Sequence, residues 1–189
     1  MIVRRIAVGA SFALTLALAL PLAHGQGVVA AKSEIGFTVK QMGVKFDGRF
    51  RKWTADVVFQ PKALATSKAS LDIDLGSIDL ASDESEAEAK GPLWFNTAKF
   101  PVAHFVSTAI RDLGANRYEV AGKLTLKGVT HDCVVPITVA TDADGNRIAQ
   151  GAFSIARLDY RIGEGEWADT GVVDNDIVVR VRMMLAPVP

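Results

Sequence analysis

The sequence predicts an all-β protein built from about eight or nine short antiparallel strands. The first observation is a hydrophobic period of two: Ile35, Phe37 and Val39 alternate with polar side chains. Successive side chains of a strand face opposite sides, so such a run has one apolar and one polar face. The second observation is that turn residues such as Asp144-Gly145 separate the runs, and a helical pattern interrupts them only once. Short connections of this kind favour antiparallel pairing.

The remaining alternating runs extend this pattern toward the C-terminus. They are residues 44–50, 55–59, 71–75, 118–127, 149–157 and 177–185. Strands with one apolar face form either a two-layered sandwich or a closed barrel, and the alternation alone leaves both open. A barrel of about eight strands is either packed solid or holds one small ligand.

The interruption at residues 82–92 predicts one short acidic helix. Asp83 and Glu86 have the spacing of a capping box, and further acidic residues in the first turns suit a helix N-terminus. Gly91 and Pro92 then predict where the helix ends. The helix leads the chain directly into a segment rich in aromatic residues.

The N-terminus has the three regions of a secretory signal peptide. Arg4 and Arg5 precede an uncharged apolar stretch at residues 6–22, and the small residues Ala23 and Gly25 follow it. The alternative is a membrane anchor, but the apolar stretch has about 17 residues and a span needs about 20. The pattern therefore favours export and cleavage.

We expect a cleaved signal peptide at residues 1–25 and one domain at residues 26–189. The chain has 21 basic and 21 acidic residues, so removal of the two N-terminal arginines leaves a net charge of −2. This balance gives no indication of a nucleic-acid partner, which requires basic patches. The single cysteine, Cys133, lies in an apolar run that favours a buried small side chain over a reactive thiol.

Four segments carry a resemblance that the alternation alone does not. They are SEIGFTVKQMGVKFDGRF (33–50), LWFNTAKFPVAHFVST (93–108), YEVAGKLTLKGVTHDCVVP (118–136) and FSIARLDYRIGEGEW (153–167). In this order they resemble the YceI-like, polyisoprenoid-binding protein family through nearly the whole predicted domain. Residues 76–101 and 163–179 also resemble the branch of that family that is linked to b-type cytochrome partners.

The resemblance implies a periplasmic, antiparallel, eight-stranded lipocalin-like barrel with a long apolar interior and one or two short helices. It implies binding of an extended amphiphile such as a polyisoprenoid, a quinone tail or a fatty-acid derivative. It brings no catalytic residue, and it implies no cofactor other than the lipid ligand, an isoprenoid quinone being one candidate. The chain departs from the family at Arg161, where a glycine usually follows the aromatic residue, and a large cation there can reshape the turn at residues 158–163.

The aromatic segment at residues 91–108 is the strongest candidate for contact with an apolar ligand, because the chain has only 7% aromatic residues. We combine its rings with the inward-facing positions of the predicted strands. The resulting candidate ligand-binding residues are Phe37, Val39, Phe46, Phe50, Trp94, Phe95, Phe105, Leu124, Leu126, Phe153 and Ile155. Apolar pockets and ordinary cores use the same side chains, so a purely structural role for each of them stays open.

Two polar motifs are interpreted as structural. Residues 142–146 resemble the start of a calcium loop, but Arg147 and Phe153 stand where such a loop needs glycine and glutamate, so the motif predicts a hairpin turn. His131 and Asp132 are neighbours on one strand and face opposite sides, so they do not converge on a nucleophile. We therefore expect neither a catalytic nor a metal site.

Charged side chains near the predicted ends of the barrel have structural and functional interpretations. One set is a basic run that consists of Lys40, Lys45, Arg49, Arg51 and Lys52. We interpret it as a solvated outer face, and the alternative is a site at the barrel mouth that binds the head group of a ligand. Arg157 and Asp159 lie two residues apart in one strand, and we expect them to pair at the surface.

The main functional hypothesis is a periplasmic carrier that sequesters a long-chain isoprenoid or acyl lipid. The alternatives are an enzyme acting on such a lipid and an accessory that transiently meets a b-type cytochrome of the inner membrane. The apolar residues 57–59 and 178–179 leave room for a homodimer face.

Overall fold

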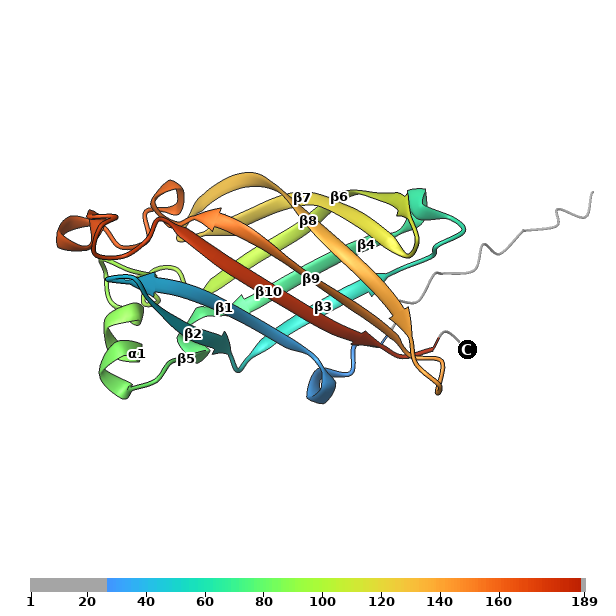
Figure 1. The fold of residues 1–189 in the computed structure, drawn as a ribbon, viewed down its shortest axis with the longest axis horizontal. Coiled ribbons are helices and arrows are strands. Elements are labelled where there is room, and N and C mark those ends of the chain that lie inside the picture. The colour runs from blue at the N-terminus through green and yellow to red at the C-terminus, as the bar shows by residue number, and fades with distance from the viewer. Residues whose placement is uncertain (1–26, 188–189) are drawn as a thin grey trace, which may run out of the picture.

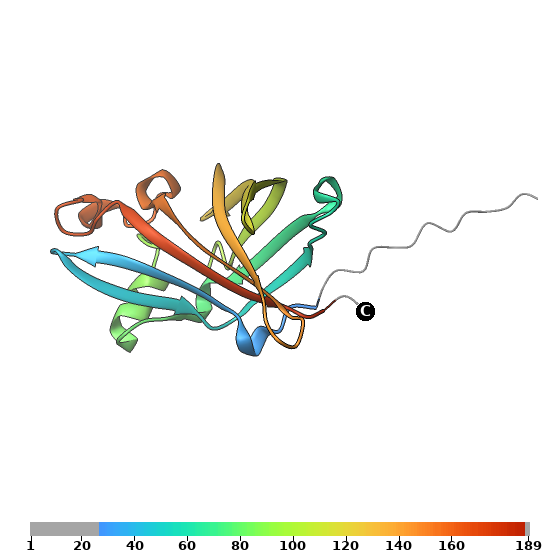
Figure 2. The ribbon, with the colours of Figure 1, turned by 45° about the vertical axis from the view of Figure 1, so that its right-hand side comes forward.

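The fold is one antiparallel sheet that curls into a half-barrel (Figures 1 and 2). The computed structural model describes residues 27–187, so the predicted signal peptide lies outside the described residues. The sheet has ten strands in the order β3-β4-β6-β7-β8-β9-β10-β1-β2-β5. Their bounds are β1 Glu34–Gln41, β2 Val44–Phe50, β3 Trp53–Val58, β4 Lys68–Asp74, β5 Ile78–Asp79, β6 Val102–Gly114, β7 Arg117–Leu126, β8 Val129–Thr141, β9 Arg147–Ala156 and β10 Asp176–Leu185.

The all-β antiparallel prediction is confirmed, but the count of eight strands is wrong. Two bends account for the difference: two residues separate β2 from β3, and a short 3₁₀ turn separates β4 from β5. At these bends the amide of Arg51 donates to the carbonyl of Ser77, and the amide of Asp74 donates to the carbonyl of Lys52. The two bent strands therefore touch where the sheet curls around to meet itself, and hydrophobic alternation alone does not mark such a bend.

Antiparallel pairing sorts the connections into two ends of the barrel (Figure 1). The hairpin that joins β1 to β2 lies at one end with helix α1 (Asp83–Lys90) and the loop between β9 and β10, and we call this the helix end. The β6–β7 and β8–β9 hairpins lie at the opposite end, which we call the hairpin end. Short 3₁₀ turns complete the fold: η1 Ala30–Lys32, η2 Leu64–Thr66, η3 Leu75–Ser77, η4 Arg157–Tyr160 and η5 Gly165–Ala168.

The predicted acidic helix is confirmed as α1, with a different N-cap. The Ser82 hydroxyl caps the helix by accepting from the amide of Ser85 at 3.2 Å, so Asp83 is already inside the first turn. Glu86 does not complete a capping box; its carboxylate bonds Lys90 at 3.2 Å and Arg51 at 3.3 Å. A serine fits this cap as well as aspartate does, and spacing alone did not distinguish them. None of the helices within residues 27–187 is both long enough and apolar enough to span a bilayer.

Candidate functional site

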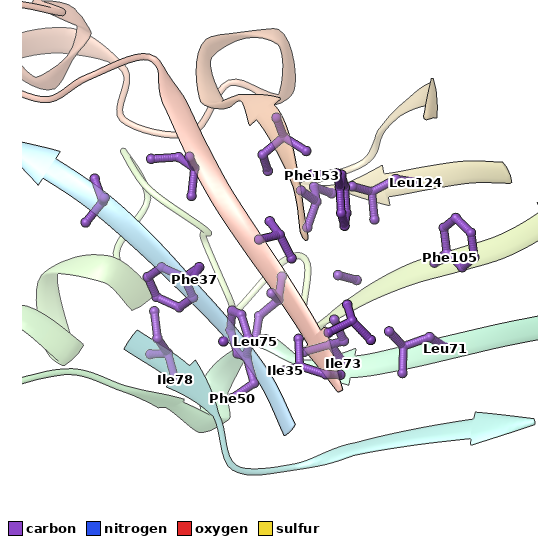
Figure 3. Close-up of a pocket in the computed structure, with 18 of the residues that line it drawn as sticks. Ile35, Phe37, Phe50, Leu71, Ile73, Leu75, Ile78, Phe105, Leu124 and Phe153 are labelled. Carbon is purple, nitrogen blue, oxygen red and sulfur yellow. The ribbon is translucent and has the colours of Figure 1, made fainter. Parts of the chain in front are cut away.

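The curled sheet encloses a cavity of about 1010 Å³ with a predominantly apolar wall. All ten strands contribute lining residues, together with η3, α1, the aromatic segment before β6 and the loop between β9 and β10. Figure 3 shows aliphatic and aromatic side chains from distant parts of the sheet converging on this space, among them Phe37, Leu71, Phe105 and Phe153. Drug-sized ligands occupy pockets of about 300–1,000 Å³, so the cavity lies at the upper limit of that range.

All eleven candidate ligand-binding residues from the sequence line this cavity. Those on β1 and β2 are Phe37, Val39, Phe46 and Phe50; those before and on β6 are Trp94, Phe95 and Phe105; those on β7 and β9 are Leu124, Leu126, Phe153 and Ile155. The alternation placed the nine strand residues correctly because each lies at an inward position of its strand, whereas Trp94 and Phe95 reach the cavity from the turn before β6. Their contact with a ligand stays a prediction.

Two glycines let aromatic rings lie flat along the wall. Gly48 pairs with Phe37 across the β1–β2 ladder, and a side-chain carbon at this glycine would collide with the Phe37 ring and with Leu80. Gly122 on β7 likewise lies under the ring of Phe105 on the neighbouring strand. Because glycine has no Cβ, each ring occupies space over its neighbour's backbone that any other residue would fill.

Several lining residues were not among the sequence candidates. They include Leu71, Ile73, Leu75, Ile78, Trp167, Ile177, Val179, Val181 and Met183. The runs 71–75 and 177–185 already showed alternation, so this signal could have added their inward residues. Nothing local in the sequence indicated that Trp167 or the face of α1 would reach the same space.

The mouth of the cavity lies between β2 and α1. The lining residues with exposed side chains are confined to these two places: Phe46, Asp47, Ala81, Ser82, Glu84, Ser85, Ala87 and Glu88. Phe46 is 42% exposed although its ring also belongs to the cavity wall. An apolar chain can therefore pass from outside to inside beside this ring, and charged groups rim the opposite side of the opening.

The hairpin end of the cavity is closed by packed side chains. Phe59 and Tyr118 meet edge-on with ring centroids 5.1 Å apart, and each is 7% exposed. Met183, Leu185 and Ile35 complete this buried cluster. The guanidinium of Arg147 covers the outside, 5.8 Å from the Phe59 ring, and donates to the Phe59 carbonyl.

At the helix end, the loop between β9 and β10 is held by Arg157. This side chain is 1% exposed and donates to five backbone carbonyls at 2.7–3.1 Å, those of Ile162, Gly163, Trp167, Val173 and Asp174. Desolvation lowers the pKa of Arg157 from its ordinary value. The predicted pair with Asp159 is wrong, because the chain turns into η4 at Arg157 and strand parity ends there.

A second buried cation, Lys127, also holds the loops at this end, and we call the bonds made by Arg157 and by Lys127 the two clasps. Its ammonium group donates to the carbonyls of Leu93 and Arg161 and lies 3.0 Å from the carboxylate of Glu164. It thereby joins the aromatic segment to the β9–β10 loop. Arg161, where the family usually has glycine, adopts a left-handed backbone with φ 57°. Glycine reaches this conformation without strain, and here arginine occupies it with its side chain in solvent.

Two tryptophans connect α1 to the loops. The Trp167 ring lies 5.5 Å from that of Trp94, and its Nε1 donates to the Glu88 carboxylate of α1 at 3.0 Å. Trp94 lines the cavity, and its Nε1 is the one buried side-chain nitrogen or oxygen within residues 27–187 that lacks a hydrogen-bond partner. An unpaired buried donor costs about 1–3 kcal/mol, so an acceptor atom from a ligand would be stabilising there.

The motifs interpreted as structural have structural partners. The Asp142 carboxylate accepts from the amides of Asp144 and Asn146, which is the geometry of a hairpin turn. His131 bonds the carbonyl of Asp159, whereas Asp132 pairs with Lys123 at 2.7 Å, so the histidine and the aspartate do not converge. In the part of the chain that the structure describes, no three His, Cys, Asp or Glu side chains are arranged to hold a metal ion.

The predicted basic run lies on the outside of the barrel, largely in ion pairs. Arg49 and Arg51 bind the Asp79 carboxylate at 2.7 Å and 2.6 Å, and these bonds lower the pKa of Asp79. Lys40 pairs with Asp174 at 3.3 Å. The solvated-face interpretation therefore fits these three residues.

Cys133 is half-buried in the apolar cluster near the helix end. Burial raises the pKa of its thiol, which disfavours the reactive thiolate. The neighbouring Tyr160 is also buried, and desolvation raises its pKa to about 12. Both groups are therefore neutral at physiological pH and act as packing side chains.

Comparison with known proteins agrees with this architecture. BcnA of Burkholderia cenocepacia has a crystal structure that matches with a TM-score of 0.81 and 36% identity, over 84% of this chain and 99% of that one. A polyisoprenoid binding domain from Saccharophagus degradans, implicated in plant cell wall breakdown, matches with a TM-score of 0.68 and 19% identity, over 89% and 100% of the two chains. The latter likeness supports the fold alone.

Sequence relatives and a family model agree with these structures. A UPF0312 protein of Vibrio parahaemolyticus is 33% identical over 138 residues, which cover 70% of this chain and 71% of that protein. The model of the YceI-like domain matches residues 27–185, nearly the whole described chain. The chain therefore belongs to the YceI-like family.

Proposed function

We propose that this protein is a periplasmic carrier that holds the apolar tail of a long-chain amphiphile in the barrel cavity. The ligand class is a polyisoprenoid, a quinone tail or a fatty-acid derivative. The observation that carries the proposal is a cavity of about 1010 Å³ whose interior is apolar and whose exposed lining is confined to one mouth. A single opening into an apolar lumen suits a molecule that enters tail first.

The physics of burial accounts for affinity without many polar contacts. Each methylene removed from water contributes about 0.8 kcal/mol, so a chain of about ten methylenes contributes about 8 kcal/mol before the cost of ordering it. Polar lining groups gather at the mouth, including Asp47, Glu84 and Glu88. A ligand therefore places its head group near the mouth and its tail toward Phe59 and Tyr118.

Binding fits the interior better than catalysis does. Beyond the mouth, the charged side chain in the lining is Arg157, and all of its donors are used on backbone carbonyls. General acid–base or nucleophilic chemistry requires groups that converge on a reacting atom. The carboxylates of the described cavity wall, Asp47, Glu84 and Glu88, all lie at the exposed mouth and not in the apolar interior that would hold the tail.

Two further observations support transport of a lipid outside the cytoplasm. The N-terminal pattern predicts export, with Arg4 and Arg5 ahead of an apolar stretch and small residues at the predicted cleavage site. A protein of the same fold from Saccharophagus degradans is described as a polyisoprenoid binding domain.

The test is native mass spectrometry of the protein purified from periplasm, followed by solvent extraction and identification of the lipid. We expect one isoprenoid or acyl species for each chain. Phe153→Asp places a charge in the wall and should abolish lipid retention, whereas Ser154→Asp, on the exposed face of the same strand, should leave it unchanged.

Circular dichroism would establish that both variants keep the β-fold. A lipid-free mass that persists after incubation with quinones and fatty acids would overturn the proposal. Equal lipid content in a folded Phe153→Asp variant would mean that the tail does not occupy this part of the cavity.

A further inference from the structure

The turn between β1 and β2 presents apolar side chains where a water-facing turn usually has polar ones. Met42 and Gly43 have φ 49° and 79°, the pattern of a tight hairpin turn that favours Asn, Asp or Gly at both positions. Met42 is nevertheless 77% exposed, the largest value among the exposed large hydrophobic residues of the described chain. Val44 is 58% exposed and Phe46 is 42% exposed. We call Met42, Val44 and Phe46 the apolar tip.

The apolar tip is held in place rather than carried on a loose loop. The amide of Met42 donates to the carbonyl of Val172 at 2.8 Å, and the amide of Asp174 donates to the carbonyl of Lys40 at 2.9 Å. The Lys40 ammonium also pairs with the Asp174 carboxylate at 3.3 Å. Backbone bonds to the β9–β10 loop therefore hold these apolar side chains in the solvent.

The tip is continuous with the mouth of the cavity. Phe46 belongs to both, because its ring is exposed and lines the cavity, and Val39 and Gln41 on the facing strand are also lining residues. An apolar path thus leads from Met42 along the hairpin into the lumen. Such a path would let an apolar tail move between an apolar phase and the lumen without being exposed to water.

The charges around the mouth orient this surface. Lys45 lies between Val44 and Phe46 of the apolar tip, and a lysine stem can reach along apolar surface while its ammonium group meets lipid phosphate. Across the mouth, α1 presents the exposed carboxylates of Glu84 and Glu88. An anionic membrane surface repels these helix carboxylates, so contact is edge-on through the hairpin.

We propose that the apolar tip inserts into the boundary between head groups and acyl chains of a phospholipid bilayer, and that lipid passes between the bilayer and the cavity beside Phe46. The inference rests on the proposed carrier function and adds the membrane as the docking partner. Contact through a few side chains is weak and reversible, which suits a carrier that must leave the membrane with its cargo.

The experiment compares the mature protein, secreted from cells, with the double variant Met42→Ser/Val44→Ser. Flotation with vesicles of phosphatidylethanolamine and phosphatidylglycerol measures membrane binding. Transfer of a fluorescent long-chain fatty acid out of these vesicles measures delivery. We expect the double variant to lose at least about tenfold in both, which corresponds to about 1.4 kcal/mol. Its affinity for the same fatty acid supplied from a soluble cyclodextrin complex should be unchanged.

Leu113→Ser is the matched control. Leu113 is 48% exposed near the tip of the β6–β7 hairpin, at the opposite end of the barrel. The Leu113→Ser variant should float with the vesicles and transfer the fatty acid as the unmodified protein does. Equal losses in both variants, or flotation of the double variant at the level of the unmodified protein, would overturn the proposal. A dimer in gel filtration that the double variant dissolves, with no flotation of either protein, would overturn it in favour of a second copy on this surface.

Failure of the carrier function would look different. If the cavity variant Phe153→Asp loses fatty-acid binding but still floats, the docking proposal is supported independently of the cargo. If the unmodified protein floats through its tip but never binds a lipid in the cavity, the docking surface stands and the carrier function fails.

Discussion

The two ends of the barrel are closed by different kinds of interaction. At the hairpin end, Phe59 and Tyr118 pack edge-on inside a buried apolar cluster. At the helix end, an apolar layer is also present, but the covering loops are fastened by Arg157 and Lys127 through hydrogen bonds to backbone carbonyls. Figure 1 shows α1 and the β9–β10 loop gathered at this second end.

This difference indicates which end can open. Separating packed rings exposes apolar area to water, which costs about 25 cal/mol for each Å². Hydrogen bonds between a side chain and a carbonyl exchange with water bonds at a net cost of about 0.5–1.5 kcal/mol each. The bond that joins α1 directly to the loop, between Trp167 and Glu88, is exposed, whereas the bonds by which Arg157 keeps the loop folded are buried or partly buried.

The largest expected effect is the loss of Arg157. Arg157→Met keeps the length of the side chain but leaves five carbonyls without their donor, so we expect the free energy of unfolding to fall by about 4 kcal/mol. Urea unfolding measures this change. Arg161→Met, at the exposed position nearby, should cost less than about 1 kcal/mol. Similar costs for the two variants would mean that the clasp is unimportant.

The second effect tests the hairpin end. Phe59→Ala removes a buried ring and should destabilise the protein by about 3 kcal/mol. The same change at the mouth, Phe46→Ala, should cost less than about 1 kcal/mol because that ring is already 42% exposed. Thermal unfolding of the two variants compares the ends directly. A larger cost at Phe46 would reverse the assignment of the closed end.

The smallest effect on stability concerns the link between α1 and the loop. Trp167→Phe keeps an aromatic ring against Trp94 but removes the donor to Glu88, so stability should change by less than about 1 kcal/mol. Dissociation of a fluorescent fatty acid should become about threefold faster, since less free energy holds the mouth closed. Stopped-flow measurement provides the rate. Glu88→Gln retains an acceptor and serves as the control; an unchanged rate in Trp167→Phe would show that opening occurs elsewhere.

The sequence was most informative about residues whose role depends on their own strand. Phe37, Leu124 and Phe153 each lie at an apolar position of an alternating run, and each lines the cavity. The acidic helix was also predictable, apart from its cap at Ser82. These features are local, because the two faces of a strand and the charge at a helix terminus are fixed by neighbours within a few residues.

The sequence was least informative where the partner is distant or is a backbone atom. Arg157 was expected to pair with Asp159, yet its partners are carbonyls that come together only after the β9–β10 loop folds back. Carbonyls are present at every position, so no residue pattern marks those that will accept. Trp167 was not expected near the cavity, because its contact with α1 joins segments 79 residues apart.

By itself, the sequence determined an antiparallel β-fold, the inward set of apolar side chains and one acidic helix, since each follows from local periodicity and end effects. Only the tertiary structure decided the bends that divide two strands, the place of the mouth beside Phe46 and the clasps of Arg157 and Lys127. The physical reason is that these features depend on how far the sheet curls before its bent strands meet. Curvature is a sum over all strand pairs, and no single segment of the chain specifies it.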